Sequence, residues 1–174
     1  TGSGTTSSSP GTTSGGAALR ATTVVQGLRV PWEMRFLPDG RLLVTERGGR
    51  VVVADLDSGV VGEVGTVDVL ARGEGGLMGM ALDPEFSQRP YLYLSFTHDQ
   101  EGERANRVSR FEVLGYDPQA GDGGPAAGGA AADADNAGVG RLSLGSETVL
   151  IDGIPAGSNH DGSRVAFGPD GYLW

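Results

Sequence analysis

The sequence contains no cysteine and no lysine. The absence of cysteine excludes disulfides, thiolate metal sites and thiol nucleophiles from its 174 residues. The sequence also has no apolar run of about 18 residues, so no segment of it is predicted to span a membrane. The 13 basic residues are all arginine, are scattered along the chain and are outnumbered by 22 acidic ones. This charge pattern argues against a nucleic-acid partner.

The two ends of the chain differ in character from its middle. Thr1–Gly16 contains only Thr, Gly, Ser and Pro, and therefore lacks the apolar surface that offsets the entropy of ordering. We predict a flexible tether over 1–22. Because such a tether is typical of exported proteins, we also predict an extracytoplasmic location, secreted or tethered to the cell envelope. Trp174 lies in an apolar run after a Pro-Asp-Gly turn, where a strand should begin, and we expect the natural chain to continue beyond it.

Residues 23–174 show the pattern of an all-β domain. Short apolar runs with alternating character are broken at close intervals by Gly, Pro and Asp, and no segment keeps a helical apolar period. We predict strands of about five to seven residues at Arg41–Glu46, Val51–Asp55, Leu77–Leu82, Tyr91–Phe96, Arg107–Val113 and Glu147–Ile151.

One turn motif recurs along this domain, as FLPDGRLL at 36–43, LDPEFSQRPYLYL at 82–94 and FGPDGYLW at 167–174. Pro presets φ at the first central position of a turn and Gly accepts a positive φ, so the motif predicts a hairpin. The first two copies lie about 46 residues apart, close to the length of a four-stranded propeller blade. The Ala/Gly/Asp-rich residues 117–140 are predicted to be a loop insertion that lengthens the second interval. The repeat favours a β-propeller over the alternative, a β-sandwich.

Two polar, glycine-rich segments between the strands are candidate functional loops. Gly73–Gly76 carries Glu74 and could equally be a tight turn with a solvated carboxylate. Ser158–Arg164 concentrates one His, one Asp, one Asn and one Arg. Histidine can act as a general base near neutral pH, although the same loop could be a polar connection without a catalytic role. The other histidine, His98, begins the charged run HDQEGER and is predicted to be solvated surface. The acidic residues of that run lack the spacing of a calcium loop, so no metal ligand is assigned.

Four blocks of the sequence are VPW at 30–32, FLPDGRLLVTERGGRV at 36–51, GEGGLMGMALDPEF at 73–86 and NHDGSRVAFGPDGYLW at 159–174. In their order and in their residues these blocks resemble the soluble PQQ-dependent glucose/sorbosone (aldose sugar) dehydrogenase family. The resemblance covers most of Gly27–Arg110 and Ile151–Trp174 and leaves out the tether and the insertion.

The resemblance implies a six-bladed β-propeller that binds pyrroloquinoline quinone (PQQ) and Ca²⁺ around its axis, of which this chain covers roughly the first two to three blades. It implies oxidation of aldose sugars at the anomeric carbon to lactones, with hydride transfer to the quinone and electrons passed on to an acceptor. In this scheme His160 is the general base, and Glu74 and Asn159 are cofactor-binding. Arg164 is expected to support the loop, and the Ca²⁺ ligands are expected in the later blades.

Two other functions compete with this enzyme. One is a non-enzymatic propeller recognition module of the cell envelope, because a fold does not fix a function. The other is a structural repeat protein. The combination of Glu74 with His160 favours the enzyme, since a recognition surface needs no proton acceptor at that point. An open propeller exposes strand edges, so we expect residues 1–174 alone to be inactive.

Overall fold

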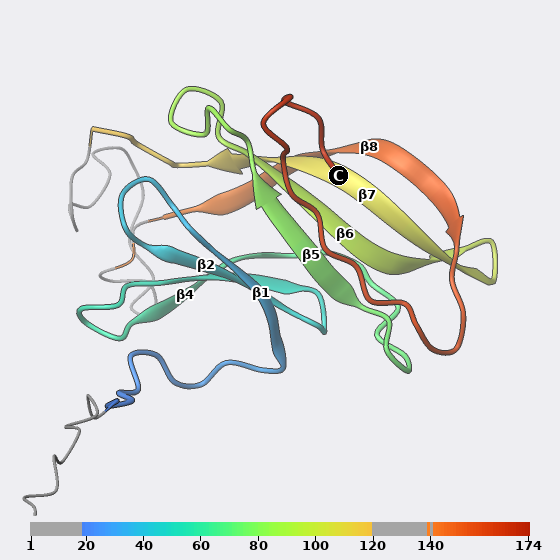
Figure 1. Cartoon of the computed structure of the whole chain (residues 1–174), viewed down its shortest axis with the longest axis horizontal. Coiled ribbons are helices and arrows are strands. Elements are labelled where there is room, and N and C mark those ends of the chain that lie inside the picture. The colour runs from blue at the N-terminus through green and yellow to red at the C-terminus, as the bar shows by residue number, and fades with distance from the viewer. Residues whose placement is uncertain (1–18, 120–138, 140) are drawn as a thin grey trace, which may run out of the picture.

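The computed structural model describes residues 19–119, 139 and 141–174. This part of the chain forms two four-stranded antiparallel sheets, β1–β4 and β5–β8, which lie side by side in Figure 1. The all-β prediction is therefore confirmed. Within the described residues there is no helix long and apolar enough to cross a membrane. The strands are β1 (Pro31–Phe36), β2 (Leu42–Glu46), β3 (Arg50–Ala54), β4 (Val61–Thr66), β5 (Leu77–Leu82), β6 (Tyr91–Gln100), β7 (Glu103–Leu114) and β8 (Ser143–Pro155).

The recurring turn motif occupies equivalent places in the fold. Its first copy joins β1 to β2, where the N–H of Gly40 bonds to the carbonyl of Leu37 and the backbone takes a φ of 89°. Only glycine adopts such a φ readily. The second copy joins β5 to β6, and the third closes a hairpin around the bridge between Phe167 and Leu173. The repeat therefore marks the same hairpin in successive units of the chain.

Two strands were missed by the sequence prediction. In β1 the apolar side chains Trp32, Met34 and Phe36 are exposed while Glu33 is buried, so its pattern is the reverse of an ordinary half-buried strand. β4 contains two glycines, which weaken the strand signal. The predicted strands at 91–96, 107–113 and 147–151 all extend further than expected, because β6, β7 and β8 form long ladders with one another.

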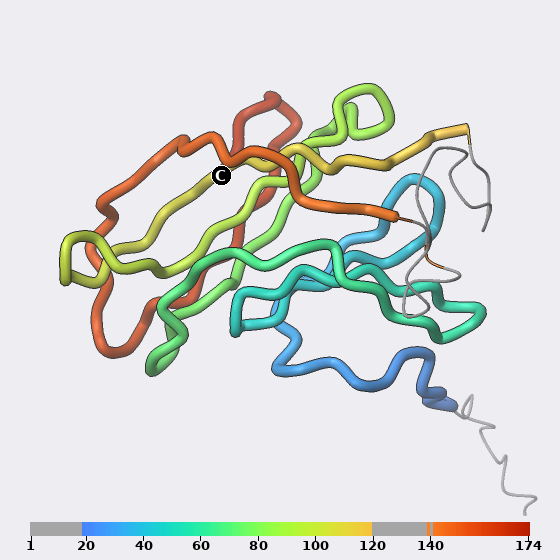
Figure 2. Tube along the Cα trace, turned by 180° about the vertical axis from the view of Figure 1, so that it is seen from behind, coloured from blue at the N-terminus to red at the C-terminus, as the bar shows by residue number. Residues whose placement is uncertain are grey.

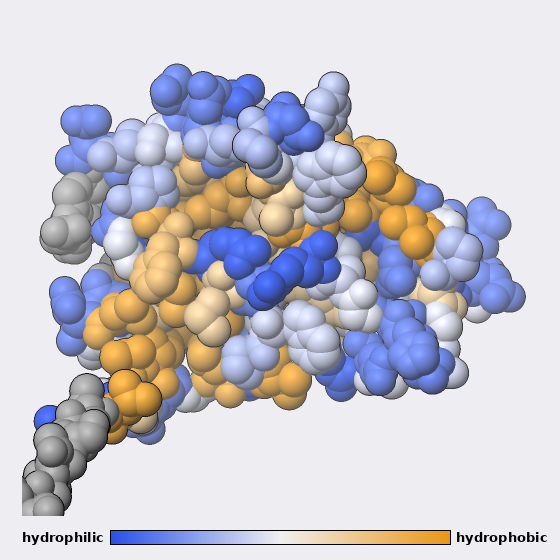
Figure 3. Space-filling model, viewed as in Figure 1, coloured by the Kyte–Doolittle hydropathy of each residue, from blue (hydrophilic) through white to orange (hydrophobic). Residues whose placement is uncertain are grey.

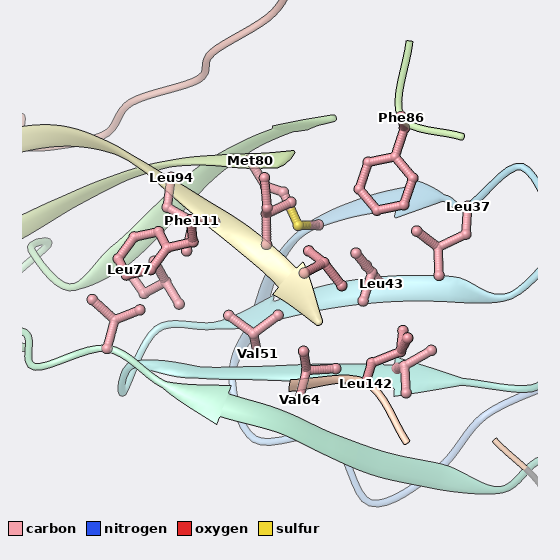
Figure 4. Packing of buried hydrophobic residues seen from close by; sticks show 14 of the residues in the cluster. Leu37, Leu43, Val51, Val64, Leu77, Met80, Phe86, Leu94, Phe111 and Leu142 are labelled. Carbon is pink, nitrogen blue, oxygen red and sulfur yellow. The ribbon is translucent and has the colours of Figure 1, made fainter. Parts of the chain in front are cut away.

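The main hydrophobic core lies between the two sheets (Figure 4). β1 contacts β5 and β4 contacts β8, so equivalent strands of the two sheets face each other. Leu43 and Leu77 have no exposed surface, and burying one such side chain contributes about 1.5–3 kcal/mol. At the outer strands, Leu144 fills the space beside Gly65, where a Cβ would lie 3.1–3.2 Å from its side chain. This strand-for-strand packing is the arrangement of successive propeller blades.

A smaller cluster covers the other face of the first sheet. Val25 and Leu28, ahead of β1, pack there against Leu42, Val44 and Val52. Residues 19–22 carry no strand, and 1–18 lie outside the described part, as does most of the predicted insertion at 117–140. In the space-filling view the hydrophobic surface is broken up by hydrophilic side chains over the middle of the molecule (Figure 3).

Candidate functional site

The two candidate loops identified from the sequence come together at one end of the molecule. Gly73–Gly76 lies between the first sheet and β5, and the second loop, Ser158–Arg164, follows β8. Figure 2 shows the green and orange-red segments that contain them side by side at the lower left. The carboxylate Oε2 of Glu74 accepts a hydrogen bond from the backbone N–H of His160. The structure thus joins the two residues that the sequence singled out separately.

Close backbone contacts explain why the first loop is rich in glycine. A Cβ at Gly73 would lie 2.6 Å from the carbonyl oxygen of Ser158, in the second loop. A Cβ at Gly75 would lie 2.8 Å from Oγ1 of Thr97. Both distances are shorter than real side-chain contacts, so a larger residue at Gly73 would push the two loops apart, and one at Gly75 would push the first loop away from β6. The glycines therefore allow Glu74 to approach His160.

Arg47 fixes the first loop to the first sheet. Its Nη1 donates to the carbonyl of Gly73 at 2.6 Å and to that of Gly75 at 3.1 Å. The backbone carbonyl of Arg47 in turn accepts the N–H of Leu77 at 2.9 Å, at the start of β5. One guanidinium thus satisfies two loop carbonyls and holds Glu74 between them.

The second loop is held by a buried carboxylate beside the candidate base. Asp161 is 3% exposed, and its Oδ1 accepts the N–H of Gly157 at 2.8 Å. Arg104, from β7, donates to the carbonyl of Gly157 and lies 3.4 Å from Oδ2 of Asp161. His160 itself has a φ of 62°, a left-handed conformation that costs about 1–2 kcal/mol for a residue other than glycine. Its side chain is exposed, as is that of Asn159.

Arg164, the last residue of the second loop, bonds to the first sheet. Its Nε donates to Oε2 of Glu33 at 3.0 Å, which connects the end of this loop to β1. Glu33 is buried and also accepts Nη1 of Arg35 at 2.6 Å. Burial would raise the pKa of Glu33, but the hydrogen bonds from the Met34 N–H and Arg164, with the charge of Arg35, outweigh it and lower the pKa.

The prediction that His98 is solvated surface was wrong. His98 lies on β6 and is 8% exposed, and its Nε2 is 2.8 Å from Oδ1 of Asp152 on β8. The hairpin of β6 and β7 extends further than the alternation of the sequence suggested, so His98 falls inside the sheet. The hydrogen bond from Arg107, at 2.5 Å, is the main cause that lowers the pKa of Asp152 below its usual range.

No metal site is found in the part of the chain that the structure describes. There, no three His, Cys, Asp or Glu side chains are grouped so that they could hold an ion. Asp99, Glu101 and Glu103 lie at the turn between β6 and β7, where Asp99 Oδ1 accepts the N–H of Gly102 at 2.8 Å. Asp99 therefore stabilises a hairpin turn.

The paired meanders and the two joined loops define part of a β-propeller with a polar site at one end of its blades. Residues 28–174 match the Glucose / Sorbosone dehydrogenase family, and the chain belongs to that family. The PQQ-bound form of aldose sugar dehydrogenase from Streptomyces coelicolor is 32% identical, with a TM-score of 0.66, and the match covers 87% of this chain and 39% of that chain.

Two curated relatives agree with this assignment. Aldose sugar dehydrogenase YliI of Escherichia coli is 33% identical over 89 residues, which are 50% of this chain and 24% of the relative. Quinoprotein glucose dehydrogenase B of Acinetobacter calcoaceticus is 25% identical over 161 residues, 87% of this chain and 29% of the relative. The chain thus spans well under half the length of the proteins it matches.

Sequence reasoning missed three residues that shape this site. Arg47 lies within the quoted block at 36–51 but carried no signal of its own. Arg104 lies in the charged run after His98, which looked like solvated surface. Asp161 was visible in the block at 159–174, yet nothing in the sequence showed that its carboxylate is buried against Gly157.

Proposed function

We propose that this protein oxidises aldose sugars at the anomeric carbon to lactones in a PQQ-dependent reaction, with His160 as the general base. The observation that supports it best is the hydrogen bond from the His160 N–H to Glu74. These residues come from two separate blocks that match the dehydrogenase family. A chain that only had to fold would not need an exposed imidazole held in a strained backbone conformation at that place.

The residues at this end of the molecule fit a polar, planar cofactor. His160, Asn159 and Glu74 are exposed side chains that offer an imidazole, a carboxamide and a carboxylate. The glycines of the first loop allow it to lie against its neighbours, so that these three side chains lie at the same end of the molecule. We infer that Glu74 and Asn159 hold the quinone end of PQQ. When bound, PQQ supplies a two-electron acceptor for the hydride that leaves the anomeric carbon.

The part of His160 in the reaction is proton acceptance. Hydride departs readily from a carbon whose hydroxyl has lost its proton, and a neutral imidazole nitrogen can take that proton near pH 7. Glu74 accepts the backbone N–H of His160 and thereby fixes the position of the backbone from which the imidazole extends. Arg164 bonds to Glu33 and so supports the end of the second loop.

The test is reconstitution of the full-length protein with PQQ and Ca²⁺, followed by dye reduction with a panel of aldoses. Loss of the general base is expected to lower kcat by about 10²–10⁴-fold in His160→Gln. His98→Gln is the matched control, because it removes the other histidine of these 174 residues, which bonds to Asp152 instead of lying at the site. A well-folded protein that neither binds PQQ nor turns over any aldose would favour a recognition module.

Three further expectations belong to this proposal. Ca²⁺ is required, with ligands outside the described residues, and chelation should abolish activity until Ca²⁺ is restored. The 174-residue chain alone is inactive, since it spans 39% of the PQQ-bound relative and exposes apolar side chains such as Ile151 and Trp174. The protein is extracytoplasmic, as the composition of Thr1–Gly16 suggests, and cell fractionation tests this.

A further inference from the structure

Two residues bond to the backbone of Gly157, just ahead of the candidate base. Asp161 Oδ1 accepts the N–H of Gly157 at 2.8 Å, and Arg104 Nη1 donates to the carbonyl of the same glycine. The two side chains also face each other, with 3.4 Å between Arg104 Nη1 and Asp161 Oδ2. Both polar groups of Gly157 are therefore bonded to a charged partner, which is stronger than bonding to neutral groups.

Arg104 and Asp161 together form a clamp on Gly157, and this clamp is anchored in the second sheet. Arg104 lies on β7, opposite Asp99 of β6, and its side chain is 22% exposed. Asp161 is almost fully buried, and a buried carboxylate persists only where it is paired and hydrogen-bonded. The segment 157–161, which has no strand or helix of its own, is thus fixed to the second sheet at the start of β7.

The clamp lies where the loop most needs support. His160 is held at a φ of 62°, which a histidine keeps only when its surroundings impose it. Glu74 holds the N–H of His160 from the first loop. The pair of Arg104 and Asp161 holds the loop on both sides of His160, at Gly157 and at Asp161 itself. The direction in which the imidazole leaves the backbone follows from these contacts.

We propose that Arg104 and Asp161 are positioning residues for the imidazole of His160. They act through the backbone of 157–161 and not on the substrate. The inference rests on the proposed function of His160 as the base. A misplaced base weakens the transition state more than the bound substrate, so losing the clamp lowers kcat while KM changes little.

The experiment uses the full-length protein with Arg104→Met, Arg104→Lys and Asp161→Asn. Arg110→Met is the control, because Arg110 lies on the same strand but stacks on Tyr91, with its guanidinium carbon 4.4 Å from the ring centroid. Amide hydrogen exchange at Gly157 and His160 is measured without cofactor. Kinetics are then measured with PQQ, Ca²⁺ and the aldose that the wild type oxidises fastest.

Arg104→Met is expected to raise exchange at both amides at least about tenfold while the amides of β5 and β6 stay protected. It is expected to lower kcat about tenfold to a hundredfold, with KM within about threefold of the wild type. Arg104→Lys restores part of the loss, because it keeps a charge beside Asp161 but has no planar fork. Asp161→Asn, which preserves shape, changes both readouts in the same direction as Arg104→Met. Arg110→Met alters neither readout.

Two results overturn the inference and can be told apart. If the wild type oxidises an aldose but Arg104→Met leaves exchange at Gly157 and His160 unchanged, or leaves kcat unchanged, the clamp has no positioning role. If the wild type binds no PQQ and oxidises no aldose, the proposed function fails. The inference then fails with it, even if amide exchange at Gly157 and His160 rises in Arg104→Met.

Discussion

The carboxylate of Glu74 accepts the backbone N–H of His160, a residue 86 positions further along the chain. One partner lies in the connection between the two sheets and the other in the segment that leaves β8. The contact therefore exists only when the start of β5 and the end of β8, at the two edges of the second sheet, have been placed. Arg47, which follows β2 of the first sheet, bonds to the carbonyls on both sides of Glu74, so the neighbouring blade also supports the candidate site.

Removing the carboxylate of Glu74 should leave the backbone N–H of His160 without its hydrogen-bond acceptor and so loosen the position of His160. Glu74→Ala is expected to lower kcat by about tenfold to a hundredfold, the range that corresponds to a hydrogen bond with a charged partner. Glu74→Gln keeps an oxygen acceptor and should lose less. Steady-state kinetics with PQQ and Ca²⁺ check this, with Glu85→Ala as a control at the exposed turn between β5 and β6. Equal losses in Glu74→Gln and Glu74→Ala would show that the carboxylate acts by its charge.

The left-handed backbone of His160 predicts an order of stabilities. Asparagine tolerates a positive φ, whereas a β-branched residue does not. His160→Val should therefore have a free energy of unfolding about 1 kcal/mol lower than His160→Asn. Urea titration of both variants measures the difference. Because both lack the imidazole, both should be inactive, and identical stabilities would mean that the backbone at this position relaxes freely.

Acid should weaken the contact between β7 and β8. The folded-state pKa of Asp152 is lowered, chiefly by the hydrogen bond from Arg107. A lowered pKa means that the stabilisation is fully present above the unfolded pKa, about 3.9, and is lost as the pH falls below it. The free energy of unfolding of Asp152→Asn should consequently fall less than that of the wild type between about pH 4 and pH 2.

The matched control for this titration is Asp57→Asn, which changes an exposed carboxylate in the turn between β3 and β4. Its acid titration should run parallel to that of the wild type. If Asp57→Asn and Asp152→Asn flatten the curve equally, the network of Asp152 does not contribute specifically to acid stability.

More of the fold than of the candidate site could be predicted from the sequence. Turn chemistry identified the hairpin at Pro38-Asp39-Gly40 because Pro and Gly act locally. β1 was not predicted, because a buried glutamate does not fit the pattern of an ordinary strand. The partner that bonds to Glu33 there, Arg164, lies far away in the chain. The same limit applies to His98, whose partner Asp152 lies on another strand. Local patterns reveal turns and strands, whereas partners across a sheet become visible only when the strands have been placed.

Gly76 offers a test of whether close approach or backbone conformation makes glycine necessary in the first loop. Its φ is 142°, and a Cβ there would overlap the carbonyl oxygen of Arg47. Gly40 also has a positive φ, 89°, but a Cβ there would have nothing within 4 Å. Gly76→Ala should lower the free energy of unfolding by about 2–3 kcal/mol, and Gly40→Ala by about 1 kcal/mol or less.

Kinetics extend this comparison to the site. Overlap at Gly76 displaces the backbone of Arg47, whose guanidinium holds the carbonyls on both sides of Glu74. Gly76→Ala should therefore also lower kcat under conditions where the variant is still folded, whereas Gly40→Ala should leave kcat at the wild-type value. Denaturant titrations and turnover measured on the same samples separate the two effects. Equal stability losses with unchanged turnover in both variants would mean that the loop moves aside without disturbing Glu74.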